Sequence, residues 1–325
     1  MDAPPQTECP PAPTLTVVVP LYRSAATVRP LVEALESLAV EGGHEIVLVH
    51  DGSPDDTLEA ARQVVRGARR VPIKLVDHAR NFGEHNAVLT GLRHARGRWI
   101  VTMDDDLQNP PEEVLRLLAH ARSHDLDCVY GRYRTKAHSW FRNLGSRFTN
   151  WVSCFVLDKP PGLYLSSFRC LSAFLAREIC RHDGPFPYID GLILQATARI
   201  GSVEVRHEPR REGRSGYTLR KLVRLWMSMF INFSVLPLRL ATVAGLLLGA
   251  AGGVVLVVVL VEYLFFGVPV RGWGSLMAGL AVFSGTQLIM LGLIGEYLGR
   301  VFLTLNRRPQ AVVRAVEVGG PGARR

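Results

Sequence analysis

Cysteine is scarce in this chain, with five among 325 residues, and no two have the Cys-x-x-Cys spacing of common zinc and redox sites. This scarcity argues against a small secreted fold held together by disulfides and fits a reduced compartment. We therefore expect the cysteines to be small, buried apolar residues. No internal repeat is present either.

The first residues lack what a secretory signal needs. Residues 1–14 are rich in proline and contain neither a basic start nor an apolar stretch. This composition predicts a disordered leader. We expect the large domain that follows it to stay in the cytosol.

Charged residues are missing from two long stretches, 240–261 and 272–295. Each is long enough to cross a hydrocarbon core of roughly 30 Å as a helix. The chain is 48% hydrophobic and its mean hydropathy of +0.14 is high for a soluble enzyme. We predict a two-helix transmembrane hairpin over 237–300. The alternative is a pair of buried core helices, which would normally carry a polar stripe that these stretches lack.

The net charge of +9 would suit nucleic acid, but the position of the charges favours a membrane instead. Eight basic residues lie between Arg206 and Arg239, before the first apolar stretch, and Arg300, Arg307 and Arg308 follow the second. The positive-inside rule predicts that the large domain, both termini and a basic tail over 301–325 are cytoplasmic, in a multi-pass protein of the inner (plasma) membrane. The expected partners are the membrane and a lipid phosphate, with no nucleic acid.

Between these regions, 217–236 places Arg220, Lys221 and Arg224 on roughly one helical face and apolar side chains such as Trp226 on the other. This pattern predicts an amphipathic interfacial helix lying on the bilayer. A helix packed on the soluble domain is the alternative.

Residues 15–216 alternate between short apolar runs and helical patterns. The runs at 15–19, 46–49, 73–76, 99–103 and 128–130 are nearly continuous in apolar residues, as in strands buried on both faces. We therefore predict an α/β domain with a mostly parallel, Rossmann-like sheet covered by helices on both sides.

Polar clusters follow three of these runs, where the carboxyl ends of parallel strands form ligand sites. They are Pro20-Leu21-Tyr22, His50-Asp51-Gly52-Ser53 and Asp104-Asp105-Asp106-Leu107-Gln108. Three adjacent carboxylates repel one another unless a cation is present, and Mg²⁺ and Mn²⁺ prefer oxygen ligands. In an extended turn, Asp104 and Asp106 would project to the same side. An acidic turn that leads into a helix is the alternative.

Together with VVVPLY, HDGSPDDT, RNFGEHNAVLTGL, RREGRSGYT and GEYLGR, the run MDDDLQNPPEEV resembles family 2 glycosyltransferases of the polyprenyl-phosphate type. The similarity extends to undecaprenyl-phosphate aminoarabinose and glucosyl transferases and, more distantly, to dolichyl-phosphate mannose synthase. It implies a GT-A domain that transfers a sugar, with inversion, from a nucleotide-sugar, expected to be a UDP-sugar, to polyprenyl phosphate for cell-envelope glycans. It also implies a homo-oligomer.

The resemblance also implies roles for individual residues. Asp104, Asp106 and Gln108 would hold Mg²⁺ or Mn²⁺, with the two aspartates catalytic. The donor-binding residues that it implies are Pro20 and Tyr22 beside the nucleoside, Asp51 on the base edge, Asp105, and Arg80, Asn81 and Gly83 in a loop beside the donor. The catalytic or phosphate-binding residues that it implies on the acceptor side are Arg132, Arg134, Arg169, Arg210, Ser215 and Tyr217.

Several positions depart from the pattern of this family, among them Arg23-Ser24, which stand where an Asn-Glu pair is common. His50 replaces an aspartate, Gly216 replaces a lysine, and Leu163 stands where an aspartate is often found. A lipid phosphate is largely dianionic at neutral pH and needs positioning more than a general base, so Leu163 is compatible with transfer. Two alternatives stay open: a processive polysaccharide synthase, which usually has more spans and a Q-x-x-R-W element, and a catalytically silent scaffold that binds nucleotide-sugar.

Overall fold

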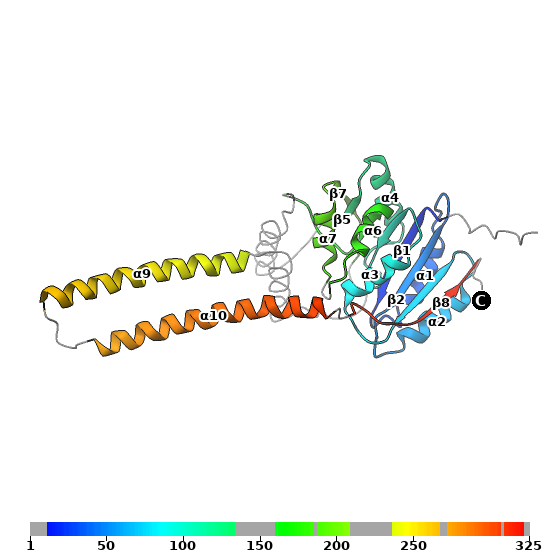
Figure 1. Ribbon diagram of the computed structural model, residues 1–325. Coiled ribbons are helices and arrows are strands. Elements are labelled where there is room, and N and C mark those ends of the chain that lie inside the picture. Colours follow the sequence, from blue (N-terminus) through cyan, green and yellow to red (C-terminus); the bar gives the residue numbers. More distant parts are fainter. Residues whose placement is uncertain are drawn as a thin grey trace, which may run out of the picture. The chain divides into compact units, whose positions relative to one another are not determined.

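The computed structural model describes residues 12–133, 160, 162–184, 187–208, 236–266, 272–306 and 309–321. The chain divides into two units (Figure 1). Unit 1 comprises Met1–Gly216 together with Pro309–Arg325, and unit 2 comprises Tyr217–Arg308.

Unit 1 is built on an eight-stranded sheet with the order β7-β5-β6-β4-β1-β2-β3-β8. The strands are β1 Leu15–Leu21, β2 His44–His50, β3 Ile73–His78, β4 Trp99–Thr102, β5 Cys128–Tyr133, β6 Arg169–Ser172, β7 Ile200–Val205 and β8 Val313–Gly319. The four neighbours β4, β1, β2 and β3 are parallel, so their carboxyl ends lie along one edge of the sheet. β6 runs antiparallel between β4 and β5.

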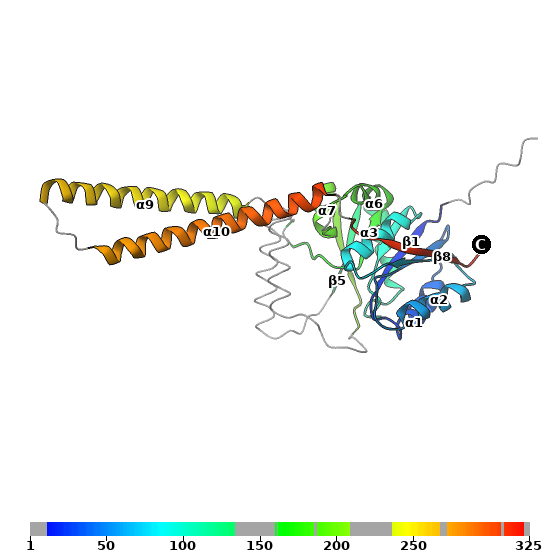
Figure 2. The same ribbon diagram turned by 60° about the horizontal axis from the view of Figure 1, so that its bottom comes forward.

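Helices cover both faces of this sheet (Figure 2). On one face lie α1 Val28–Glu36, α2 Thr57–Gly67 and α4 Glu113–Ser123, and on the other α3 Glu84–His94, α6 Ala173–Cys180 and α7 Ile189–Ala196. In α1, the buried residues Val28, Leu31, Val32 and Leu35 recur at helical spacing and form the stripe that meets the sheet. β2 is buried along its whole length, which explains its nearly continuous apolar sequence. The predicted α/β sheet is confirmed.

The two ends of the chain contribute to unit 1 more than the sequence predicts. Val313–Gly319 is not part of a free basic tail: it forms β8, which pairs antiparallel with β3. Valines at 313, 316 and 318 favour a strand, although arginine pairs at 307–308 and 324–325 flank the segment. At the other end, the last residues of the predicted leader are ordered, because the N–H of Thr14 donates to Gly42 O and that of Arg98 to Pro13 O.

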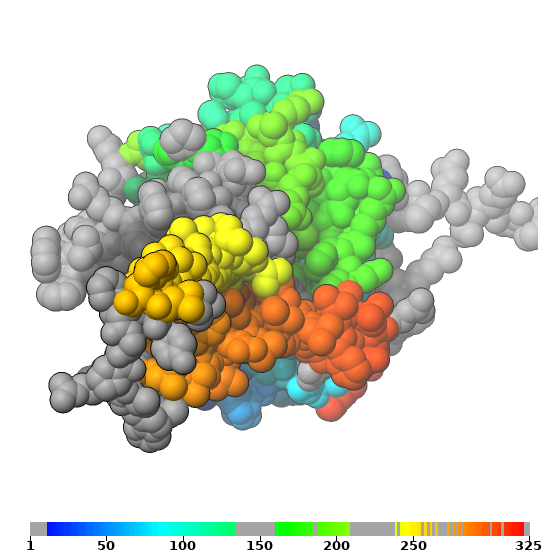
Figure 3. All heavy atoms as spheres, turned by 60° about the vertical axis from the view of Figure 1, so that its left-hand side comes forward, coloured from blue at the N-terminus to red at the C-terminus, as the bar shows by residue number. Residues whose placement is uncertain are grey.

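Unit 2 contains two long helices, α9 Leu236–Phe266 and α10 Trp273–Leu305, which lie side by side (Figure 3). At 1.5 Å per residue, their 31 and 33 residues measure about 46 and 50 Å. Large apolar side chains on both helices are exposed, among them Leu246 at 74% and Ile289 at 76%.

Within the described residues, one helical stretch, Val282–Leu305, is long and apolar enough to cross a membrane, with a mean hydropathy of 1.6. The apolar stretch Ala241–Val254 in α9 is shorter. The two predicted spans are both helical, and their crossing of a bilayer stays a prediction. Of the predicted interfacial helix over 217–236, residues 217–235 lie outside the described part of the chain.

Candidate active site

An acidic turn follows β4 at the edge of the sheet where the parallel strands end. Its three carboxylates have different partners: Asp104 Oδ2 accepts a hydrogen bond from Ser167 Oγ at 2.6 Å, and Asp106 Oδ1 accepts one from the N–H of Gln108 at 3.1 Å. Asp105 Oδ2 instead accepts from the N–H of Tyr22 at 3.2 Å and from the Ser24 hydroxyl. Asp105 thus ties the turn to the end of β1.

The turn concentrates negative charge. Burial raises the pKa of Asp105 to about 6, assisted by the charges of Asp104 and Asp106 and opposed by the hydrogen bonds from Ser24 and Tyr22. Glu84, at the start of α3, is partly accessible to solvent. Desolvation by the surrounding protein and then the charge of Asp104 raise its pKa to about 7. A divalent cation would relieve this repulsion.

Oxygen ligands suited to Mg²⁺ or Mn²⁺ are therefore present, but they do not form a complete cage. No group of three or more His, Cys, Asp or Glu side chains in the described part of the chain is arranged to hold a metal ion. Gln108 Nε2 donates to Glu208 O at 3.1 Å, so the oxygen is the end of this amide that a cation can bind. A cation here would need further ligands from a diphosphate or water, as Mg²⁺ commonly does.

Asp51 is buried, and both of its carboxylate oxygens have partners inside the protein. It is 3% exposed, and its Oδ1 accepts from His78 Nδ1 at 2.9 Å and from the N–H of Phe82 at 2.8 Å, while Oδ2 accepts from the N–H of Gly83 at 2.8 Å. Burial by itself would raise the pKa of Asp51, but these hydrogen bonds outweigh it and lower the pKa. Asp51 thus orders the backbone at Phe82 and Gly83, and its predicted contact with the base edge stays a prediction.

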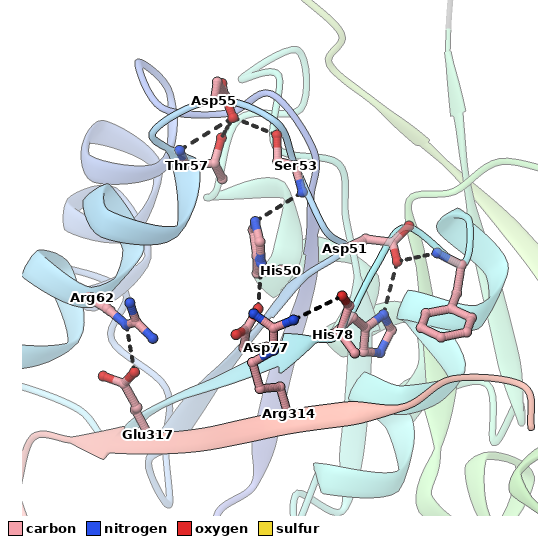
Figure 4. A network of polar contacts seen from close by, with 12 residues as sticks. His50, Asp51, Ser53, Asp55, Thr57, Arg62, Asp77, His78, Arg314 and Glu317 are labelled. Carbon is pink, nitrogen blue, oxygen red and sulfur yellow. Dashed lines mark hydrogen bonds and ion pairs between the residues drawn. The ribbon is translucent and has the colours of Figure 1, made fainter.

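His50 forms a second buried pair with Asp77. Its Nε2 accepts from the N–H of Ser53 at 3.0 Å, so Nδ1 carries the proton and donates to Asp77 Oδ1 at 2.7 Å (Figure 4). Sequence reasoning missed both His–Asp pairs. The sequence holds a signal for them: His-Asp stands at the end of β2 and Asp-His at the end of β3. The register of these two parallel strands places His50 opposite Asp77.

Residues 80–83 form the loop that is predicted to lie beside the donor, hereafter the donor loop. Arg80 and Asn81 are exposed, and the Arg80 guanidinium lies 4.7 Å from the centre of the Phe82 ring. Gly52 contacts this loop closely: its φ is +57°, and a Cβ there would lie 2.3 Å from the carbonyl carbon of Arg80. Only glycine fits this position.

The end of β1 provides an exposed aromatic ring next to the acidic turn. Tyr22 is 45% exposed, and Pro20, two residues earlier, is partly buried. The N–H of Tyr22 contacts Asp105, so the expected nucleoside residues and the acidic turn are neighbours.

Comparison with known proteins identifies the family of this site. Residues 16–181 match the model of glycosyl transferase family 2. The chain belongs to this family. It is 31% identical over 313 residues to the undecaprenyl-phosphate 4-deoxy-4-formamido-L-arabinose transferase of Proteus mirabilis, with 93% of both chains covered. It is 32% identical over 320 residues to the transferase of the same name from Pseudomonas aeruginosa strain LESB58, with 95% of this chain and 92% of that one covered.

These relatives place the chain within the polyprenyl-phosphate type of family 2, as the motifs predicted. A crystal structure of a mycobacterial protein is also similar, with a TM-score of 0.50, 20% identity, and coverage of 67% of this chain and 73% of that one. At that identity the likeness concerns the fold alone.

Arg169, predicted to contact the acceptor phosphate, forms a buried ion pair within the family 2 domain. It is 2% exposed, and its guanidinium pairs with Asp190, which also accepts from Tyr130 Oη at 2.9 Å. The guanidinium is therefore engaged inside the protein, and its predicted contact with an acceptor phosphate stays a prediction. Leu163, in the position of the missing aspartate, packs in the core.

Arg169 also supports the acidic turn through other residues. Its Nε donates to Thr102 Oγ1 at 3.3 Å, Thr102 Oγ1 donates to Ser167 O at 2.7 Å, and Ser167 Oγ donates to Asp104. This connection joins β4 to β6 beneath the carboxylates. Sequence reasoning missed Ser167, because its contact with Asp104 spans 63 residues.

The other predicted acceptor residues are only partly covered by the structure. Arg132 is exposed on β5, with its Nη2 3.9 Å from a carboxylate oxygen of Glu204. The remaining four lie outside the described residues: Arg134, Arg210, Ser215 and Tyr217.

Proposed function

We propose that this family 2 member transfers a sugar from a nucleotide-sugar, expected to be a UDP-sugar, to a polyprenyl phosphate lipid for cell-envelope glycans. The observation that carries the proposal is similarity over nearly the whole chain to transferases named for undecaprenyl phosphate. The acidic turn supports it, because its carboxylates could hold the cation that stabilises a diphosphate leaving group.

The proposed reaction is one in-line displacement. An oxygen of the lipid phosphate attacks the anomeric carbon of the sugar, the bond from that carbon to the diphosphate oxygen breaks, and the nucleoside diphosphate leaves, so the configuration inverts. The acceptor is already largely dianionic at neutral pH, which agrees with a core leucine at position 163.

Residues of the acidic turn would divide the remaining work. Asp104, Asp106 and the Gln108 amide oxygen would hold Mg²⁺ or Mn²⁺, which when bound neutralises charge on the leaving diphosphate. Asp105 keeps the turn attached to β1 beside Tyr22. The exposed arginine Arg132, with Arg134, Arg210, Ser215 and Tyr217, is proposed to bind phosphate oxygens of the donor or the lipid.

We propose that α9 and α10 cross the inner membrane and leave the catalytic domain and both termini in the cytoplasm. Exposed apolar side chains on both helices and the basic flanks of the apolar stretches support this topology. A helix over 217–236 lying on the cytoplasmic surface would bring the domain to its lipid substrate.

A direct assay tests the function. Full-length protein in detergent, supplied with Mn²⁺, undecaprenyl phosphate and a panel of labelled nucleotide-sugars, is expected to form one labelled sugar-lipid from one donor. The Asp106→Asn variant is expected to lose this transfer, while Asp56→Asn, an equal change at an exposed position, keeps it.

Each alternative predicts a different product. A silent scaffold would bind the donor and form no labelled lipid, and a processive synthase would form a polymer. Full metal-dependent transfer by Asp106→Asn would remove the acidic turn from the mechanism.

A further inference from the structure

The chain re-enters unit 1 soon after α10 ends, at a buried glutamine. Gln310 is 8% exposed and follows Leu305, the last residue of α10, by five positions. Its Oε1 accepts from Arg93 Nη2 at 2.7 Å, and its Nε2 donates to His182 O at 2.7 Å and to Gly184 O at 2.8 Å. Gln310 thereby fixes the returning chain to the end of α3 and to the segment after α6.

The next residues hold the start of the donor loop. The N–H of Ala79 donates to Val312 O at 2.8 Å. Arg314, labelled in Figure 4, donates from Nη2 to Ala79 O at 3.3 Å. Ala79 lies between His78, the partner of Asp51, and Arg80, the first residue of the donor loop. Both backbone polar groups of Ala79 are therefore satisfied by a segment more than 230 residues away.

The opposite side of the donor loop is held by the end of β2. Asp51 accepts from the N–H groups of Phe82 and Gly83, and Gly52 lies directly against Arg80. Residues 79–83 are thus fixed from two sides: by the domain's own β2 turn and by the segment that follows the last long helix. The loop leads directly into α3, whose far end carries Arg93, a partner of Gln310.

We propose that residues 309–319 form a positioning strap for the donor loop, and that Arg314 is a positioning residue which acts on donor binding through Ala79. The assignment of the loop to the donor rests on the proposed function; the strap's effect on the order of the loop does not. The strap makes the segment that leaves α10 part of the donor site, so a chain cut after α10 would lose donor affinity as well as a strand.

The experiment compares two arginine contacts of β8. Arg314→Met removes the bond to Ala79 O and keeps the aliphatic stem. Arg62→Met is the matched control. Arg62 lies on α2, and its Nε pairs at 2.7 Å with Oε1 of Glu317, which is on β8 like Arg314 but contacts α2 and not the donor loop. Full-length variants in detergent are measured by hydrogen exchange of residues 79–83, by the Kd for UDP with Mn²⁺, and by kcat and the KM values for donor and acceptor.

For Arg314→Met we expect amide exchange in the donor loop and the Kd for UDP to rise about fivefold each, the equivalent of one net hydrogen bond, with kcat and the KM for the lipid unchanged. Arg62→Met should alter neither loop exchange nor the Kd for UDP. Equal exchange in wild type and Arg314→Met, or equal increases in both variants, would overturn the strap. If the wild type binds no nucleotide, the proposed function fails, and loop exchange still decides on the strap.

Discussion

Asp51→Asn distinguishes a carboxylate that orders the donor loop from one that reads the base. The substitution keeps the shape of the side chain but replaces one acceptor oxygen by a donor. If the amide nitrogen takes the place of Oδ2, the N–H of Gly83 loses its acceptor; if it takes the place of Oδ1, both His78 and Phe82 lose theirs. At least one hydrogen bond to a buried charged group is therefore lost in either orientation.

The magnitude follows from that count. A hydrogen bond to a charged group contributes about 1.5–3 kcal/mol, and the stranded N–H adds to the loss, so we expect the free energy of unfolding to fall by about 2–4 kcal/mol. For a domain of this size, that corresponds to a Tm lower by about 5–15 °C. Thermal unfolding followed by tryptophan fluorescence measures it, with Asp56→Asn, exposed at the start of α2, as the control that should match wild type.

The pH dependence gives an independent check. Because folding lowers the pKa of Asp51, its ionised form stabilises the fold above the unfolded pKa of about 3.9, and that stability is lost as the pH falls through the lower folded pKa. The Tm difference between wild type and Asp51→Asn should be constant from pH 5 to 8 and shrink below about pH 4. A variant with wild-type Tm but tenfold weaker UDP binding would show that the carboxylate faces the base, and would refute this reasoning.

Three further predictions concern the polar groups around the acidic turn. Ser167→Ala removes the 2.6 Å hydrogen bond to Asp104 and should weaken Mn²⁺ binding in the presence of UDP about tenfold, measured by electron paramagnetic resonance; unchanged affinity would contradict the positioning role of Ser167. Arg169→Met leaves the carboxylate of Asp190 buried without its cation and should lower the free energy of unfolding by about 3–5 kcal/mol in denaturant titration, whereas a loss under 1 kcal/mol would not fit a buried pair. Because folding raises the pKa of Glu84 from 4.5 to about 7, the fold loses stability as the pH rises from about 4.5 to 7 and changes no further above it; in metal-free buffer the Tm of Glu84→Gln should therefore gain on that of wild type over this window and keep the gain at higher pH, and parallel profiles would count against it.

Much of the architecture could be predicted from local sequence patterns. β-branched runs such as 15–19 and 46–49 form strands wherever they are buried, and the helical spacing of apolar residues between them requires helices on both faces. The position of the acidic turn also follows from local order, because Asp104 comes directly after an apolar strand and parallel strands end at one edge. The charge-free stretches likewise predicted the helical segments α9 and α10.

Which polar side chains face the ligand was decided only by the tertiary structure. Asp51 and Arg169 occupy motif positions, but contacts made 21 to 32 residues away bury both of them and use their polar atoms inside the protein. The His50–Asp77 pair depends on the register of two strands, which no single segment specifies.

The role of the C-terminus is the clearest case. Val313–Gly319 by itself reads as a short strand near a basic end, and nothing local tells which sheet edge it joins. Its place beside β3 comes from the open edge of that strand, the buried bonds of Gln310 and the pair between Arg62 and Glu317. Local order of residues determines which elements form, whereas burial and hydrogen bonding between distant segments determine which of their side chains remain available to a substrate.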